Sequence, residues 1–201
     1  MMNSTTANLA QTIIELQHQF TIEWHDNDDA PRPINEFEAL VVDQHKRNFD
    51  LWHQEDKARE PDVSDANIAQ VKRNIDQLNQ KRNDMVTELD IMLEQHYFPT
   101  AETDDLPWNS ETAGSIIDRL SIASLKVFHM QEQTERSDAS AEHIEKCKQK
   151  TYELEVQRHD LTHSLQLFFD DIVAGKKQNK LYKQFKMYND PELNPKIYAK
   201  K

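Results

Sequence analysis

Glycine occurs only twice in this chain of 201 residues, whereas average proteins contain about 7% glycine. Tight turns, and loops whose backbone closely approaches a phosphate, depend on glycine because it has no Cβ atom. The sequence therefore argues against turn-rich all-β folds. It also lacks G-x-G-x-x-G and G-x-x-x-x-G-K, the motifs of Rossmann and P-loop nucleotide sites.

Apolar residues recur every three or four positions along most of the chain, which is the period of an amphipathic α-helix. One face of the first such segment carries Leu9, Ile13, Leu16 and Phe20. This spacing and the prolines between segments predict five long helices and a short sixth, over about residues 6–24, 35–60, 64–98, 110–130, 137–174 and 180–187. We expect an all-α protein, an up-and-down bundle of about five long helices with a short C-terminal helix and a basic tail.

Residues suited to helix ends support several of these boundaries. Asn35 and Ser64 are of the type that accepts a hydrogen bond at a helix N-terminus, and Gly175 suits the position just after a C-terminus. Gly114 lies in the first turn of the fourth predicted helix. Glycine either costs a helix least at that position or lets another backbone approach closely.

The chain carries a formal net charge of −12, which argues against DNA binding by the surface as a whole. Its apolar runs are shorter than the roughly 20 residues of a membrane span. Its first residues lack the basic start and apolar core of a signal peptide. We therefore expect a cytoplasmic protein with no membrane span.

Positive charge is concentrated at the C-terminus. Residues 176–201 carry a net charge of +6 and include four aromatic residues, whereas residues 1–175 carry −18. This division predicts a bundle domain over 1–175 and a tail over 176–201 that docks on it through Lys183, Lys186 and Tyr188. A phosphate-bearing partner, such as a nucleotide sugar or a lipid headgroup, and single-stranded RNA are alternative partners of such a basic, aromatic tail.

Polar side chains occupy helix positions where a bundle needs apolar ones. They predict either a structural network or a ligand pocket between the helices. In a network Arg158, which falls within the apolar face of the fifth helix, would pair with Glu55 or Asp118, because an unpaired buried guanidinium is costly. In a pocket the polar residues would hold an anionic metabolite. The ligand-binding candidates are Asn48, Trp52, Arg59, Asn79, Arg82, Arg119, Arg158, Lys186, Tyr188 and Asn189.

Acidic residues of the same helices are candidates for catalysis or metal binding. Glu55 and Asp118 would act as bases. Mg²⁺ would be held through the carboxylate oxygens of Glu55, Asp56 and Asp76. All-α nucleoside-triphosphate pyrophosphatases use clustered acids of this kind, and residues 72–90 resemble the first helix of all-helical chorismate mutases. Both enzyme types are alternative functions for this chain.

The sequence does not indicate a zinc site or a nucleophilic cysteine. No H-E-x-x-H motif occurs, and His45 and His53 are eight residues apart. Cys147 is the only cysteine, which excludes internal disulfides and zinc sites with paired cysteines. It lies among lysines within a predicted helix, without an identifiable base.

Four strings of residues are distinctive: NFDLWHQEDKAR (48–59), IDQLNQKRND (75–84), ETAGSIIDRLSIASLK (111–126) and KQFKMYNDPELNP (183–195). They resemble a bacterial family, domain of unknown function 4254, over most of the chain. The resemblance implies an all-helical bacterial protein with no assigned activity, so it transfers no catalytic residues. Members are often associated with surface-polysaccharide gene neighbourhoods, which implies a role in glycan or lipopolysaccharide biosynthesis.

We therefore expect an interior polar site for an anionic metabolite, a sugar phosphate or a nucleotide sugar. Because the third and fifth predicted helices are longer than one small bundle needs, we also expect a homo-oligomer. The alternative function is that of a noncatalytic helical adaptor for a glycosyltransferase or a similar enzyme. A deep pocket favours the first function, whereas a filled core with a large exposed apolar patch favours the second.

Overall fold

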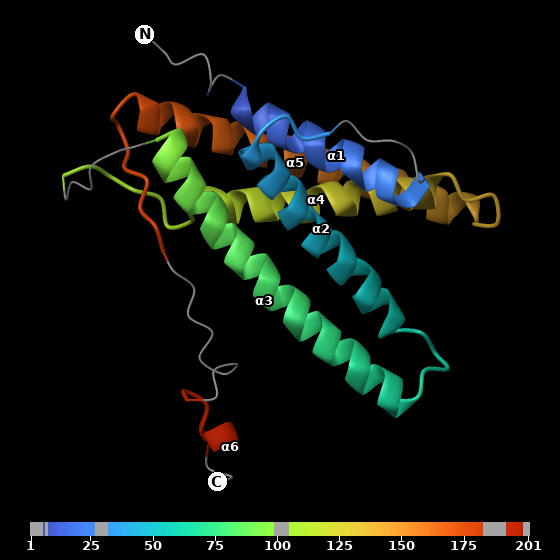
Figure 1. Ribbon diagram of the computed structural model, residues 1–201. Coiled ribbons are helices and arrows are strands. Elements are labelled where there is room, and N and C mark those ends of the chain that lie inside the picture. Colours follow the sequence, from blue (N-terminus) through green and yellow to red (C-terminus); the bar gives the residue numbers. More distant parts are fainter. Residues whose placement is uncertain (1–5, 7, 27–31, 99–104, 183–191, 199–201) are drawn as a thin grey trace.

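The computed structural model describes residues 6, 8–26, 32–98, 105–182 and 192–198 (Figure 1). The helices are α1 (Leu9–Asp26), α2 (Glu36–Lys57), α3 (Asp65–His96), α4 (Ala113–Thr134), α5 (Ala141–Val173) and the one-turn α6 (Pro195–Tyr198). This part of the chain contains no β-strand beyond an isolated bridge between Trp108 and Gln178. The prediction of an all-α helical bundle is confirmed. None of the described helices is long and apolar enough to cross a membrane.

Side-chain caps fix where four of the helices begin. In each, a side-chain oxygen accepts a hydrogen bond from the backbone N–H three residues further on, which satisfies a donor with no partner inside the helix. The capping residues are Asn35, Ser64, Thr112 and Ser140. At the other end of α5, Gly175 has a φ of +66°, as expected for a glycine that ends a helix. The predicted roles of Asn35, Ser64 and Gly175 are confirmed.

Helix α4 lies at the centre of the bundle and contacts α1, α2, α3 and α5. Helices α1, α4 and α5 run alongside one another, whereas α2 and α3 form a hairpin that crosses them and extends beyond them (Figure 1). Each of these five helices contributes to one apolar core. Fully buried members include Ile13, Val41, Leu89, Leu120 and Phe169.

Gly114 lets α3 and α4 approach closely near their contact. A Cβ atom at this position would lie only 2.5 Å from the carbonyl oxygen of Val86 and 2.9 Å from the Asp90 carboxyl carbon. The backbone N–H of Gly114 instead donates a hydrogen bond of 2.6 Å to Oδ1 of Asp90. Of the two roles considered for this glycine, the structure supports the close backbone approach.

The predicted sixth helix is wrong in its described part. Residues 180–182 are not helical, and residues 183–187 lie outside the described residues. A C-terminal helical turn begins instead at Pro195, beyond the predicted helix. Proline suits the first position of a helix because its N–H is not needed there and its φ is already helical.

The start of the C-terminal tail lies against the loop before α4. The backbone N–H and the side-chain amide of Gln178 donate hydrogen bonds to the carbonyl oxygens of Pro107 (3.0 Å) and Leu106 (2.6 Å). The ammonium of Lys180 lies 4.5 Å from the ring centroid of Trp108. The expected docking contacts Lys183, Lys186 and Tyr188 lie outside the described residues, so docking by the remainder of the tail stays a prediction.

Candidate functional site

A cavity of about 500 Å³ lies between α2, α3 and α4. It brings together seven of the residues predicted from the sequence to form a site. These are Asn48, Trp52, Glu55, Asp56, Arg59, Asn79 and Arg82. Spacings of three and four residues place the first five on one face of α2 and the turn after it, and Asn79 and Arg82 face them from α3. Leu51, Ile122 and Leu125 supply apolar walls.

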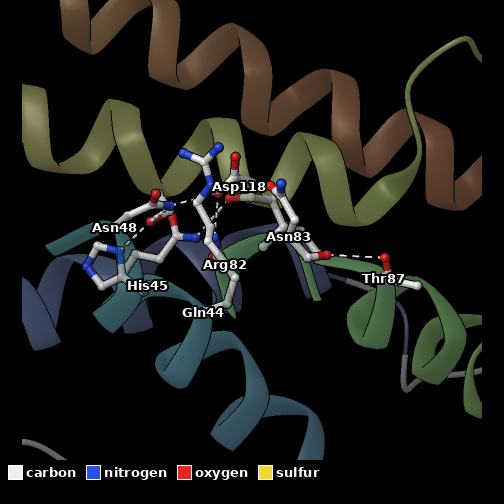
Figure 2. A network of polar contacts seen from close by, with 10 residues as sticks. Gln44, His45, Asn48, Arg82, Asn83, Thr87 and Asp118 are labelled. Carbon is white, nitrogen blue, oxygen red and sulfur yellow. Dashed lines mark hydrogen bonds and ion pairs between the residues drawn. The ribbon is translucent and has the colours of Figure 1, made fainter. Parts of the chain in front are cut away.

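Asp118 of α4 holds the polar side of this cavity in place, although it does not line the cavity itself. Its Oδ1 accepts hydrogen bonds from the side-chain amides of Gln44 (2.6 Å) and Asn48 (2.8 Å). Nε of Arg82 lies 3.8 Å from the same oxygen. Figure 2 shows these three side chains converging on Asp118 from α2 and α3. Oδ1 of Asp118 therefore positions these three side chains, and the role of Asp118 as a base stays a prediction.

The guanidinium of Arg82 has donors to spare. Its side chain is 25% exposed, and the 3.8 Å approach to Asp118 is its only ion pair among the described residues. Nε is buried and makes no hydrogen bond. In Figure 2 the terminal nitrogens turn away from Gln44, and none of them forms a hydrogen bond within the described part of the chain. A guanidinium held in this way presents a planar fork of donors to an anion.

Arg59 is arranged differently, at the exposed rim of the cavity. Its guanidinium pairs with the carboxylate of Glu55 (3.1 Å) and donates to the Glu55 backbone carbonyl (2.6 Å). Both side chains are exposed, so this pair contributes little to stability. Glu55 and Arg59 thus partly neutralise each other at the entrance.

A chain of hydrogen bonds runs from the cavity into the bundle interior. The Asn48 amide donates to Oγ of Ser121 (2.9 Å), which contacts Nδ1 of His45 (2.7 Å); Nε2 of His45 contacts Oγ1 of Thr21 (2.8 Å). Thr21 uses its single hydroxyl proton on the backbone carbonyl of Gln17 (2.7 Å), so it must accept from Nε2–H of His45. Ser121 then donates to Nδ1. Burial lowers the pKa of His45 to about 3, so the ring is neutral at physiological pH, as this pattern requires.

Two other candidates lie at exposed positions away from the cavity. Arg119 is exposed and pairs with Glu111 (2.6 Å). Asp76 is exposed and pairs with Lys72. Because Asp76 does not join Glu55 and Asp56, the predicted Mg²⁺ trio is not assembled within the described residues. Three further candidates fall outside the described residues: Lys186, Tyr188 and Asn189.

The structure corrects a second prediction, the ion pair of Arg158. We expected an ion pair with a carboxylate of another helix, but no such carboxylate lies within ion-pair distance among the described residues. Its Nη1 is buried without a hydrogen-bond partner, and burial lowers the pKa of this guanidinium. The reason is topological: α5 packs on α1 and α4 and not on α2. Glu55 is therefore out of reach, and Asp118 faces α2 and α3.

Sequence reasoning missed several buried members of the network, among them Gln44 and Ser121. Both are fully buried. Gln44 precedes Asn48 by one helical turn, and Ser121 follows Asp118 by three residues. Extending the polar faces of α2 and α4 by one position would have included both.

Comparisons with known proteins identify a family and no function. A family model described as a protein of unknown function (DUF4254) matches residues 38–181, which is more than half of the chain and includes every residue that lines the cavity. Searches of the curated proteins and of the solved structures gave no match. The chain belongs to the DUF4254 family of proteins of unknown function.

Proposed function

We propose that this protein binds an anionic small metabolite, a sugar phosphate or a nucleotide sugar, in the cavity between α2, α3 and α4. The observation that carries the proposal is the Arg82 guanidinium, which lies at the cavity with its hydrogen-bonding capacity largely unused. A phosphate oxygen pair matches the planar donor fork of arginine better than it matches the point charge of lysine.

The acidic character of the chain does not oppose this assignment. Charges on the surface are screened over about 10 Å at moderate salt, whereas Arg82 would contact the anion directly. Asp118 lies behind the cavity wall, with its Oδ1 3.8 Å from Nε of Arg82. The terminal nitrogens remain for the ligand.

The rest of the cavity suits a polar ring attached to the anion. Its volume of about 500 Å³ falls within the range of roughly 300–1,000 Å³ typical of small-molecule sites. The indole of Trp52 is held flat by stacking on the His129 ring, with centroids 4.5 Å apart and an interplanar angle of 12°. A fixed indole face is a platform for a sugar or base, and the amides of Asn48 and Asn79 lie beside it.

The setting implied by the family resemblance, surface-polysaccharide biosynthesis, uses metabolites of this class. The proposal concerns binding. Of the two candidate bases, Glu55 pairs with Arg59 at the rim and Asp118 lies behind the cavity wall. A noncatalytic adaptor for a glycosyltransferase is the competing function. Binding of a metabolite in this cavity during a ligand screen favours metabolite binding over the adaptor function.

Isothermal titration calorimetry with inorganic phosphate, glucose 1-phosphate and UDP-glucose tests the proposal. We expect at least one phosphorylated sugar to bind, and Arg82→Met to weaken its binding at least tenfold. Arg119→Met is the matched control, because Arg119 is an exposed arginine of α4 outside this cavity. Trp52→Leu should weaken the two sugar-bearing probes more than inorganic phosphate. Equal binding by wild type and Arg82→Met, or no binding of any probe at millimolar concentration, would overturn the proposal.

A further inference from the structure

Three histidines from three helices meet at one point beside the cavity. They are His25 near the end of α1, His53 of α2 and His129 of α4. One ring nitrogen from each lies within 4.8 Å of the other two. Within the described ranges, no other group of three or more histidine, cysteine or acidic side chains is gathered closely enough to hold a metal ion.

Hydrogen bonds to the Nδ1 atoms of two rings leave their Nε2 atoms free. Nδ1 of His25 lies 2.7 Å from the backbone carbonyl oxygen of Thr21, and Nδ1 of His129 lies 2.7 Å from a carboxylate oxygen of Glu132. Both oxygens are acceptors, so each Nδ1 carries the proton and each Nε2 presents a lone pair. Both Nε2 atoms are buried and have no hydrogen-bond partner.

This is the arrangement found in histidines that bind metals. The nitrogen opposite the ligating one usually donates to a backbone carbonyl or a carboxylate, which fixes the tautomer and the ring orientation. On the third ring, Nδ1 of His53 lies 3.7 Å from the carboxylate of Asp56. Ring packing alone does not account for two buried, unpaired nitrogen acceptors, since such groups are rare in folded proteins.

Aromatic neighbours hold the three imidazoles in place. The His25 ring stacks on Phe128 with centroids 4.3 Å apart, and His129 stacks on Trp52 at 4.5 Å. His53 meets the edge of Phe49 at 4.5 Å. Apolar walls of this kind exclude water and orient ligands, which strengthens binding of an ion at their centre.

We propose that His25, His53 and His129 form a binding site for a divalent transition-metal ion of the class that prefers imidazole, with Zn²⁺ as its representative. Imidazole nitrogens bind Zn²⁺ at about 2.0–2.1 Å, which places tetrahedral ligands about 3.3 Å apart. The present nitrogen separations are within 4.8 Å, so the rings move inward when an ion binds.

A second cavity borders the histidine cluster. Three protein ligands leave the fourth position of a tetrahedral ion to water or to an exogenous ligand. His129 also lines a second cavity of about 630 Å³. Trp52 and Asp56 line both this cavity and the proposed metabolite cavity. The metal site does not depend on the metabolite proposal, because its ligands come from a different set of residues.

Titration of the full chain with Zn²⁺, after removal of metals by a chelator, tests the site. We expect one ion per chain and a higher melting temperature with Zn²⁺, because an ion bound only by the folded state stabilises it. His53→Gln should lower the affinity at least tenfold and abolish the thermal shift. His159→Gln is the matched control, since His159 is exposed on α5 and outside the cluster.

A second readout uses Co²⁺, whose visible absorption is intense in a tetrahedral site. We expect this absorption in the wild type and in His159→Gln, and its loss in His25→Gln, His53→Gln and His129→Gln. His53 is 37% exposed, so His53→Gln is the variant best suited to remain folded, which circular dichroism verifies. Zn²⁺ affinity and Co²⁺ absorption that survive in a folded His53→Gln protein, or the lack of a bound ion in the wild type, would overturn the proposal.

Discussion

The backbone N–H of Gly114 donates a 2.6 Å hydrogen bond to Oδ1 of Asp90, and this bond joins the first turn of α4 to α3. The two helices approach so closely here that a Cβ atom on Gly114 would lie 2.5 Å from the carbonyl oxygen of Val86. A backbone oxygen cannot move aside as the end of a flexible side chain can.

We therefore predict that Gly114→Ala destabilises the protein by about 1–3 kcal/mol, the usual cost of overpacking a well-packed contact. Helix propensity alone predicts the opposite sign, since alanine is favoured over glycine by about 1 kcal/mol. Urea unfolding measures the difference. Ala141→Gly, at an exposed first-turn position of α5, is the control at which alanine should be the more stable residue. A Gly114→Ala protein as stable as the wild type would contradict the close approach.

Asp90 gives the same contact a pH dependence. Burial raises the pKa of Asp90 from 3.8 to about 6. Because the folded-state pKa is the higher one, the contribution of Asp90 to stability is fully present below pH 3.8 and is lost as the pH rises through about 6. The stability of the wild type relative to Asp90→Asn should thus decrease between about pH 4 and pH 7. Urea unfolding of both proteins at several pH values measures this change, and a difference that does not vary with pH would exclude it.

Arg158 provides a test of the corrected pairing. Because its Nη1 is buried without a partner, replacing it with methionine should change stability by less than about 1 kcal/mol or increase it. Breaking a buried ion pair would instead cost about 3–5 kcal/mol. Thermal unfolding of Arg158→Met distinguishes these outcomes, and a loss in the larger range would show that the guanidinium does have a charged partner in solution.

Truncation tests the contribution of the tail. Removing all residues after Gly175 deletes both hydrogen bonds of Gln178 and the contact of Lys180 with Trp108. We predict a lower melting temperature that persists in high salt, because hydrogen bonds to backbone carbonyls are not screened as exposed ion pairs are. Truncation after Tyr182 retains these contacts and is the control. If it melts as low as the shorter protein, the stabilising contacts come from residues beyond 182.

Self-association is the remaining expectation about assembly. Helices α3 and α5 contain 32 and 33 residues, and Tyr152 and Val156 lie one turn apart on α5 with 68% and 41% of their surfaces exposed. We predict an oligomer that Tyr152→Glu weakens, since a charge at an apolar interface is costly. Light scattering at micromolar concentration measures the mass. A value near 23.7 kDa for the wild type would count against an oligomer.

Much of the fold and part of the site follow from sequence spacing. The period of apolar residues and the caps Asn35 and Ser64 place the long helices to within a few residues. Spacings of three and four along α2 place Asn48 and Trp52 on one face, and that face lines the cavity. These are local properties of one helix, so a single sequence contains them.

The remaining features depend on which helices are neighbours, which spacing does not determine. Arg158 was expected to pair with Glu55 or Asp118, yet α5 does not contact α2 and Asp118 faces α2 and α3. The histidine cluster draws its members from α1, α2 and α4, so no short motif could reveal it. Pro195 begins a helical turn outside the six predicted segments, because proline is compatible with a first turn as well as with a break.

The hairpin of α2 and α3 extends beyond the other helices (Figure 1), and none of residues 58–74 is buried. Amide hydrogens in these outer turns should therefore exchange with solvent through local fraying, whereas those around Ser121 should exchange only when the whole chain unfolds. The metabolite cavity lies between the outer turns of the hairpin and the bundle interior. A ligand held by Trp52 and Arg82 would join the two arms of the hairpin and slow exchange in the turns beside the cavity. Exchange around Ser121 would slow as well, because a ligand bound only by the folded chain raises the free energy of global unfolding.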